Sequence, residues 1–171
     1  AIEIYQSIVE EGKNHNLSHC GSHAMDIMRM ESGFLHWGHD ISPEENQYEA
    51  GLSFAISYKK EIDFIGKESL LKIKDQKQNR KFIMLSLKNS KPGTPLLLHE
   101  EPIYLEDKII GRTTSSNYSF NYKKNLSFGY ISSSFSNEEL SKMDLYIEVA
   151  KQKFLALVEI NPLKDKQARF L

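Results

Sequence analysis

The residues best able to do chemistry lie between positions 15 and 49 of the chain. His15, His19, Cys20 and His23 are ligand types that zinc prefers, and on one continuous helix the histidines would share a face. Gly21 interrupts this segment, so the alternative is a polar junction between two helices with histidines at its surface. We favour the junction and predict no metal site.

A second group of reactive side chains is the run from His36 to Asp40, which reads His-Trp-Gly-His-Asp. A histidine beside a carboxylate can act as a general base. An aromatic side chain among polar ones on an irregular loop is also typical of ligand pockets. The alternative is a bridging loop in which Trp37 packs and the histidines bond to the backbone, and spacing alone leaves both interpretations open.

The elements that must position these groups fall into two unlike parts. Apolar residues at helical spacing predict helices over residues 2–12 and 22–31, followed by an ordered loop over 34–49. Partial alternation predicts a strand over 51–58. A short helix is predicted over 67–77, with Leu70, Leu71 and Ile73 on its buried side.

Short strands dominate the rest of the chain. Runs separated by turn residues predict strands over residues 82–87, 102–105, 109–114, 126–132, 145–149 and 154–160. Residues 106–108 predict a tight hairpin, and the hydroxyl-rich segment 111–116 is interpreted as a β-turn between strands. Strands at this spacing indicate a small antiparallel β-barrel or β-sandwich.

The fold class predicted from this order is α+β, with two domains. Residues 1–78 would form part of a first α+β domain, and residues 79–171 the barrel domain. The first ~60 residues offer too few elements for a core of their own. We therefore infer an N-terminal partner segment, and an exposed apolar surface would also favour a homodimer.

Composition narrows the classes of partner and compartment. The chain has 171 residues, with 22 Lys and Arg against 23 Asp and Glu, so its formal net charge is −1. This balance gives no overall field for nucleic acid or an anionic membrane. The lone Cys20 cannot form an internal disulfide, no apolar run reaches the ~18 residues of a membrane span, and the first residues do not resemble an export signal. We expect a cytoplasmic location, with no nucleic acid and no membrane as partner.

Four segments in order resemble the glycine-cleavage T-protein (aminomethyltransferase) family. They are Arg29–Phe34, Trp37–Ile41, Glu49–Phe54 and Asp63–Leu70. The Trp-Gly-His-Asp wording, with residues 111–119 and 126–131 downstream, is most similar to the folate half of dimethylglycine and sarcosine dehydrogenases. The resemblance implies the C-terminal part of a T-protein-like folate-binding module.

The function that this resemblance implies is tetrahydrofolate-dependent one-carbon transfer. In the dehydrogenases a flavin domain, which would lie N-terminal to this chain and hold FAD, oxidises an N-methylamine, and the folate module passes the one-carbon unit to tetrahydrofolate. The alternatives are the tail of a glycine cleavage system aminomethyltransferase or related demethylase, and a non-catalytic half-module that binds a partner. Whether the chain acts as an enzyme is left open, because the family's catalytic aspartate and pterin-binding glutamate belong to segments upstream of Ala1.

The family's motif also marks positions near the folate. By resemblance, the cofactor-binding candidates are Arg29, Glu31, Trp37, His39, Asp40 and Glu49, with no catalytic residue and no metal ligand in this chain. Structural anchoring is an equal interpretation for Glu31 and Asp40. The family's folate-contacting arginine is replaced here by Met25, and the usual proline before Glu49 by Tyr48.

Overall fold

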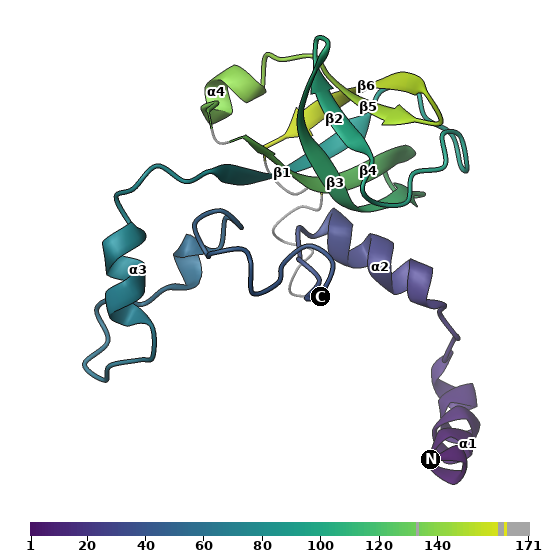
Figure 1. The fold of residues 1–171 in the computed structure, drawn as a ribbon. Coiled ribbons are helices and arrows are strands. Elements are labelled where there is room, and N and C mark those ends of the chain that lie inside the picture. Colours follow the sequence, from purple (N-terminus) through teal and green to yellow (C-terminus); the bar gives the residue numbers. More distant parts are fainter. Residues whose placement is uncertain (133, 161–162, 164–171) are drawn as a thin grey trace.

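A closed antiparallel β-barrel forms the C-terminal part of the chain (Figure 1). The computed structural model describes residues 1–132, 134–160 and 163. Around the barrel the strands follow the order β1-β4-β3-β2-β5-β6. Their bounds are β1 (Arg80–Leu87), β2 (Pro102–Leu105), β3 (Lys108–Ser119), β4 (Lys124–Ser132), β5 (Leu145–Val149) and β6 (Gln152–Glu159).

The barrel is held together by apolar side chains that point inward from alternate strand positions. Leu85, Ile103, Leu145 and Ile147 have no exposed surface. Each such side chain contributes about 2 kcal/mol through burial. A short helix, α4 (Asn137–Leu140), adds the buried Leu140 to the same core. The barrel is therefore a self-contained core that can act as a scaffold.

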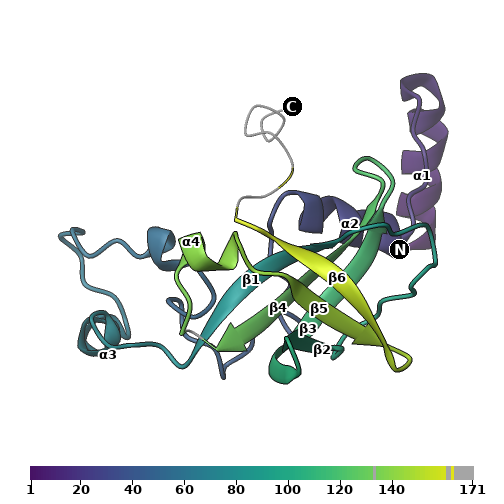
Figure 2. The same cartoon turned by 90° about the horizontal axis from the view of Figure 1, so that it is seen from above.

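The N-terminal part consists of helices joined by loops, and it lies along one side of the barrel. It comprises α1 (Ile2–Gly12), the 3₁₀ helix η1 (Lys13–His15), α2 (Ser22–Glu31), the 3₁₀ helix η2 (Ser53–Ala55) and α3 (Lys67–Ile73). Helix α2 packs on β3 and β4, whereas α1 and α3 project away from the barrel on opposite sides (Figure 1; Figure 2). Met30 of α2 is fully buried against Leu126 and Phe128 of β4.

Several of the predicted elements are confirmed. The helices over 2–12 and 22–31, the loop over 34–49, the 106–108 hairpin and the α+β class with a β-barrel all appear in the structure. The helix predicted over 67–77 ends at Ile73, and the strand predicted over 154–160 is β6, Gln152–Glu159. Leu71, predicted on the buried side of α3, is 47% exposed.

Two local predictions are wrong, for different reasons. Residues 51–58 do not form a strand: Gly51 has φ +71, which turns the chain out of the extended conformation, and Ser53–Ala55 forms η2. The segment 111–116 is not a turn but lies inside β3, which pairs with both β2 and β4. Gly111 serves close strand approach there, because a Cβ would lie 2.0 Å from the carbonyl oxygen of Tyr130.

Candidate functional site

A cavity of about 680 Å³ lies where α2, the loop after it and the barrel meet. Four segments form its wall: α2 itself, the loop around Trp37, the segment leading into β2, and β3. The lining residues are Ser22, His23, Met25, Asp26, Arg29, Leu35–Trp37, His39, Leu96–His99 and Thr114–Asn117. The wall thus combines leucine, methionine and tryptophan side chains with a small number of polar groups, as ligand pockets do.

The loop that carries Trp37 is folded into a tight turn. Asp40 N–H donates to the carbonyl oxygen of His36 at 2.8 Å, and Gly38 N–H donates to that of Ile41 at 2.8 Å. Gly38 has φ +88, a conformation that other residues rarely adopt. The turn leaves Trp37 64% exposed at the cavity while Asp40 points inward and is buried.

Asp40 fixes this turn to both α2 and the barrel. Its carboxylate forms an ion pair with Arg29 of α2 and accepts from the His36 N–H at 2.9 Å and from the Thr114 hydroxyl at 2.5 Å. Its backbone oxygen accepts from the hydroxyl of Tyr130 at 2.9 Å. Burial raises the pKa of that Tyr130 hydroxyl, so it stays a donor. Three contacts from three segments therefore hold this carboxylate in place, and a fourth, from β4, holds the Asp40 backbone.

Arg29 of α2 extends this network beyond its ion pair with Asp40. Its guanidinium pairs with Asp26 at 2.7 Å, donates to the Ser115 hydroxyl at 2.7 Å and lies 5.4 Å from the centre of the Phe128 ring. The side chain of Arg29 is only 14% exposed. Arg29 and Asp40 thus satisfy each other before any ligand enters, which supports the anchoring interpretation of Asp40.

A β-bulge makes this double attachment possible. In the pairing of β3 with β4, Thr113 faces Gly129 and Ser115 faces Phe128, so Thr114 is an extra residue on β3. In a regular strand, neighbouring side chains point to opposite faces. The bulge instead lets Thr114 reach Asp40 while its neighbour Ser115 reaches Arg29.

The two remaining carboxylate candidates lie outside this cavity. Glu31 is buried and accepts hydrogen bonds from the Ser119 hydroxyl and, at 2.9 Å, from the Asn121 amide. It therefore ties the end of α2 to the β3–β4 turn. Glu49 is buried beside Arg80, with its carboxylate 3.6 Å from Nε, and its backbone oxygen accepts from Phe82 N–H at 2.8 Å. Both are in positions that anchor the loop segments to the barrel.

The histidines of the first segment do not converge. Among residues 1–132, 134–160 and 163, no three His, Cys, Asp or Glu side chains are placed to hold a metal ion together. His23 lines the cavity, whereas the ring of His19 lies 5.9 Å from that of Tyr5 on α1. The segment Leu96–His99, which forms one cavity wall, carried no signal in the sequence beyond its three consecutive leucines.

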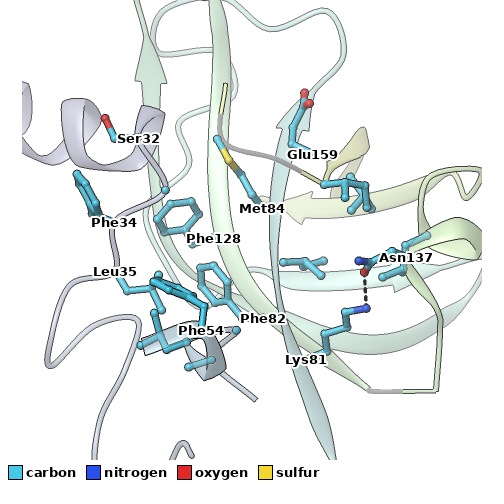
Figure 3. Close-up of a pocket in the computed structure, with 18 residues that line it drawn as sticks. Ser32, Phe34, Leu35, Phe54, Lys81, Phe82, Met84, Phe128, Asn137 and Glu159 are labelled. Carbon is cyan, nitrogen blue, oxygen red and sulfur yellow. Dashed lines mark hydrogen bonds between the residues drawn. The ribbon is translucent and has the colours of Figure 1, made fainter. Parts of the chain in front are cut away.

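A second cavity, of about 570 Å³, is lined by Phe128 of β4 together with loop residues (Figure 3). Phe34, Leu35 and Phe54 from the loop segments face Phe82 and Phe128 of the barrel across it. Lys81, which donates to the side-chain oxygen of Asn137, and Glu159 are its charged residues. Phe34 and Phe54 are 59% and 84% exposed, so this second cavity is an open apolar surface.

Comparison with known proteins identifies the family of both parts. The model of the GCVT N-terminal domain matches residues 1–60, and that of the glycine cleavage T-protein C-terminal barrel domain matches residues 80–165. The predicted boundary at residues 78 and 79 stays a prediction.

Two relatives and one solved structure illustrate the similarity. Human mitochondrial dimethylglycine dehydrogenase is 31% identical over 77% of this chain and 15% of its own length. Aminomethyltransferase of Symbiobacterium thermophilum is 32% identical over 75% of this chain and 33% of its own. The crystal structure of the glycine cleavage system aminomethyltransferase T from Bartonella henselae superposes with a TM-score of 0.81 at 19% identity, covering 95% of this chain and 44% of that one.

This chain thus spans a third or less of the length of these relatives and less than half of the solved structure. The structural neighbour shares the fold of this chain over the aligned part. Together with the two matched domain models, these similarities show that the chain belongs to the glycine cleavage T-protein family, and its relatives include aminomethyltransferases and dimethylglycine and sarcosine dehydrogenases.

Proposed function

We propose that this chain is the C-terminal part of a tetrahydrofolate-dependent one-carbon transfer module, as in an FAD-linked dimethylglycine or sarcosine dehydrogenase. The observation that carries the proposal is the cavity beside α2. The loop with the Trp-Gly-His-Asp sequence, which resembles that of these dehydrogenases, forms one wall of this cavity. Tetrahydrofolate would accept the one-carbon unit. The residues of this chain would bind and orient it and exclude water.

The cavity fits a folate in part. Trp37 offers an exposed aromatic face, Leu96 and Leu98 offer apolar surface, and His39 offers a polar group beside them. Arg29 lines the same cavity but is already paired with carboxylates. We therefore assign ligand contact to Trp37 and His39, and a positioning role to Arg29.

Glu31, Asp40 and Glu49 are assigned to positioning as well, since all three are buried and hydrogen-bonded within the protein. No residue in the described part of the chain is proposed as catalytic. FAD would belong to a separate flavin domain, and no residue of this chain is assigned to it.

The partner that we propose is the N-terminal part of the same folate module. Apolar side chains on α1 are left in solvent, with Ile2, Ile4 and Ile8 more than half exposed, and the second cavity presents Phe34 and Phe54. A surface of this kind is typical of a face that another segment covers. The GCVT N-terminal model matches this chain only over residues 1–60, and the relatives are much longer.

The native size and absorbance of the gene product test the dehydrogenase proposal. The product would be captured from its own cells with an antibody to this chain. A large yellow flavoprotein is the expected result. A colourless protein of intermediate size would instead support the second candidate, an aminomethyltransferase, which the similarity to the Symbiobacterium enzyme favours. A native species of 19.7 kDa would refute both and leave a half-module that binds a partner.

Folate binding is tested by calorimetry with tetrahydrofolate. Trp37→Ala should weaken binding about fivefold, because stacking of one aromatic ring contributes about 1 kcal/mol. Phe120→Ala is the matched control, since Phe120 is an aromatic residue that is 73% exposed and outside the cavity. Equal losses in both variants would contradict the assignment of Trp37.

A reducing compartment suits the lone, exposed Cys20, and the cytoplasmic location stays a prediction. No helix in the described ranges is long and apolar enough to cross a membrane. Relatives in the same family include mitochondrial proteins. Fractionation of the source cells with an antibody to this chain would test the location.

A further inference from the structure

One wall of the cavity beside α2, here called the leucine wall, is the segment from Leu96 to His99, which belongs to no helix or strand. Its leucine side chains alternate in direction. Leu97 is buried and packs in the barrel core, whereas Leu96 and Leu98 are more than half exposed. A segment outside the strand ladder has few backbone hydrogen bonds to hold it in place. The position of the leucine wall therefore depends on the contacts near its two ends.

Both of these contacts are made by polar side chains. Before the leucine wall, the amide group of the buried Asn125 on β4 donates to the carbonyl oxygen of Pro95 at 3.0 Å. Towards its other end, the carboxylate of Glu101 accepts from the N–H of Leu98 at 2.7 Å. Leu98 lines the cavity and Glu101 does not. Glu101 can thus influence a ligand only through the leucine wall.

We infer that Glu101 is a positioning residue for the ligand of this cavity, because it fixes the leucine wall at the spacing from α2 and the loop around Trp37 that the ligand requires. The inference rests on the proposed function and deepens it. It assigns the width of the ligand site to a residue that does not touch the ligand. Glu101 acts through Leu96 and Leu98, whose side chains offer apolar surface to a flat ring.

Glu101 is itself held by Thr113 of β3, which has no exposed surface. The second carboxylate oxygen of Glu101 accepts from the Thr113 hydroxyl at 2.5 Å, and the oxygen of that hydroxyl accepts from the Glu101 N–H at 2.9 Å. The Thr113 N–H donates in turn to the backbone oxygen of Glu101 at 2.9 Å. Three hydrogen bonds between two residues thus hold the carboxylate in the orientation in which it meets the Leu98 N–H.

This attachment lies directly beside the β-bulge of β3. Three consecutive residues of β3 each bind a charged side chain that belongs to a different wall or to the segment next to it. The pairs are Thr113 with Glu101, Thr114 with Asp40, and Ser115 with Arg29. One stretch of strand therefore sets the distances between the leucine wall, the loop around Trp37 and α2. Loss of the Glu101 carboxylate would release the leucine wall and leave the other two attached.

Substitutions at Glu101 separate these contacts. Glu101→Ala removes the bond to Leu98, and a hydrogen bond of this kind is worth about fivefold in an equilibrium constant. Tetrahydrofolate should therefore bind about fivefold more weakly to this variant. Glu101→Gln keeps an acceptor oxygen for the Leu98 N–H, and its amide group can donate to the Thr113 hydroxyl oxygen. It should bring the affinity back to within about twofold of that of the unsubstituted chain.

Calorimetry with tetrahydrofolate, on variants shown by circular dichroism to be folded, compares these proteins with Glu100→Ala. Glu100 is the matched control, because it is the adjacent carboxylate and forms an exposed pair with Arg112. If Glu101→Ala does not fold, Glu101→Asp takes its place, since the shorter side chain cannot reach both partners. Equal affinities in the unsubstituted chain and the Glu101 variant, or equal losses in the Glu101 and Glu100 variants, would refute the inference while the folate proposal stands.

Amide exchange at Leu98, followed by NMR, reports on the leucine wall without any ligand. Its rate should rise at least fivefold in Glu101→Ala and stay unchanged in Glu100→Ala, because only the first variant loses the acceptor of this N–H. Glu101→Gln should restore slow exchange together with affinity. Exchange that is equally fast in the unsubstituted chain and in Glu101→Ala would contradict the attachment itself.

If tetrahydrofolate does not bind the unsubstituted chain, the folate proposal fails, and the leucine wall is judged with indole as a flat-ring probe. Indole would be titrated at millimolar concentration while NMR follows the methyl signals of Leu96 and Leu98. We expect saturable shifts in the unsubstituted chain and in Glu100→Ala, with about fivefold weaker binding in Glu101→Ala. Methyl signals that do not move in the unsubstituted chain, or that move equally in all three proteins, would overturn the inference.

Discussion

Replacing Asp40 with asparagine removes one negative charge from the centre of the network and leaves the shape of the side chain unchanged. The carboxylate is fully buried and accepts from Arg29, from the His36 N–H and from the Thr114 hydroxyl. An asparagine offers one acceptor oxygen, and its amide group must then face at least one of these donors. Arg29 also loses a counterion.

Breaking a buried ion pair in this way costs about 3–5 kcal/mol when the remaining charge is stranded. Arg29 is not stranded entirely, because Asp26 and Ser115 each stay bound at 2.7 Å. We therefore expect Asp40→Asn to lower the free energy of unfolding by about 2–3 kcal/mol. For a chain of this length that corresponds to a fall in Tm of about 4–12 °C.

Urea unfolding followed by circular dichroism and by fluorescence measures this change. Trp37 is the only tryptophan and lies in the same turn as Asp40, so its fluorescence reports on the loop, whereas the far-ultraviolet signal reports on the whole fold. Glu100→Gln is the control, because Glu100 and Arg112 form an exposed pair, and it should cost less than about 0.5 kcal/mol. If Asp40→Asn were as mild as this control, the role assigned to the network would be refuted.

Three further changes test other parts of the fold. Gly111→Ala should destabilise the barrel by about 3 kcal/mol or more in urea unfolding, because its Cβ would lie 2.0 Å from the Tyr130 carbonyl oxygen. The control Gly21→Ala, where a Cβ would have nothing within 4 Å, should cost less than about 1 kcal/mol. Similar losses in both variants would contradict this prediction. Ser136→Ala removes the capping box of α4 and should cost about 1 kcal/mol, and no change in the urea midpoint would refute the cap. Burial, together with the hydrogen bond to Tyr58, raises the pKa of Tyr48 to about 12. The unfolded chain therefore loses this proton first, stability should fall as the pH rises from 10 to 12, and Tyr48→Phe should weaken that fall in urea midpoints; an unchanged slope would count against it.

Elements that are determined by local spacing and turn residues were predictable from the sequence. The helix that ends at Glu31 and the hairpin at residues 106–108 follow from local spacing and turn chemistry, and both appear as expected. The family resemblance likewise depends on contiguous motifs, and the matched domain models confirm it. Local sequence signals were sufficient for the elements whose conformation depends only on neighbouring residues.

Glycine shows where local signals failed. A glycine near a run of hydroxyl residues is typical of a turn. Gly111 is instead needed because the neighbouring strand β4 comes so close that a Cβ at this position would lie 2.0 Å from the Tyr130 carbonyl oxygen. The segment at 51–58 alternates like a strand, but the barrel closes on its own six strands and offers it no free edge. For Gly111 the deciding neighbour is Tyr130 on another strand, whereas for residues 51–58 the turn at Gly51 and the lack of a free strand edge decide the outcome.

The candidate site was predictable only as a set of residue types. Arg29 and Asp40 were singled out, but their shared contacts with Ser115 and Thr114 span 86 and 74 residues of sequence, which no motif reports. The wall formed by residues 96–99 was missed because three leucines before a histidine resemble any buried segment. Tertiary contact turns these side chains into one cavity.

The extra residue at Thr114 makes chain length, rather than composition, critical at this point of β3. Deleting one residue between Thr113 and Ser115 would restore regular pairing with β4 and leave the barrel closed. It would also turn one of the two hydroxyl contacts away from α2. Insertions and deletions at this point of β3 are therefore able to detach the Trp37 loop from an otherwise intact barrel. A design that transfers this loop to another barrel must also include the extra residue at the position of Thr114.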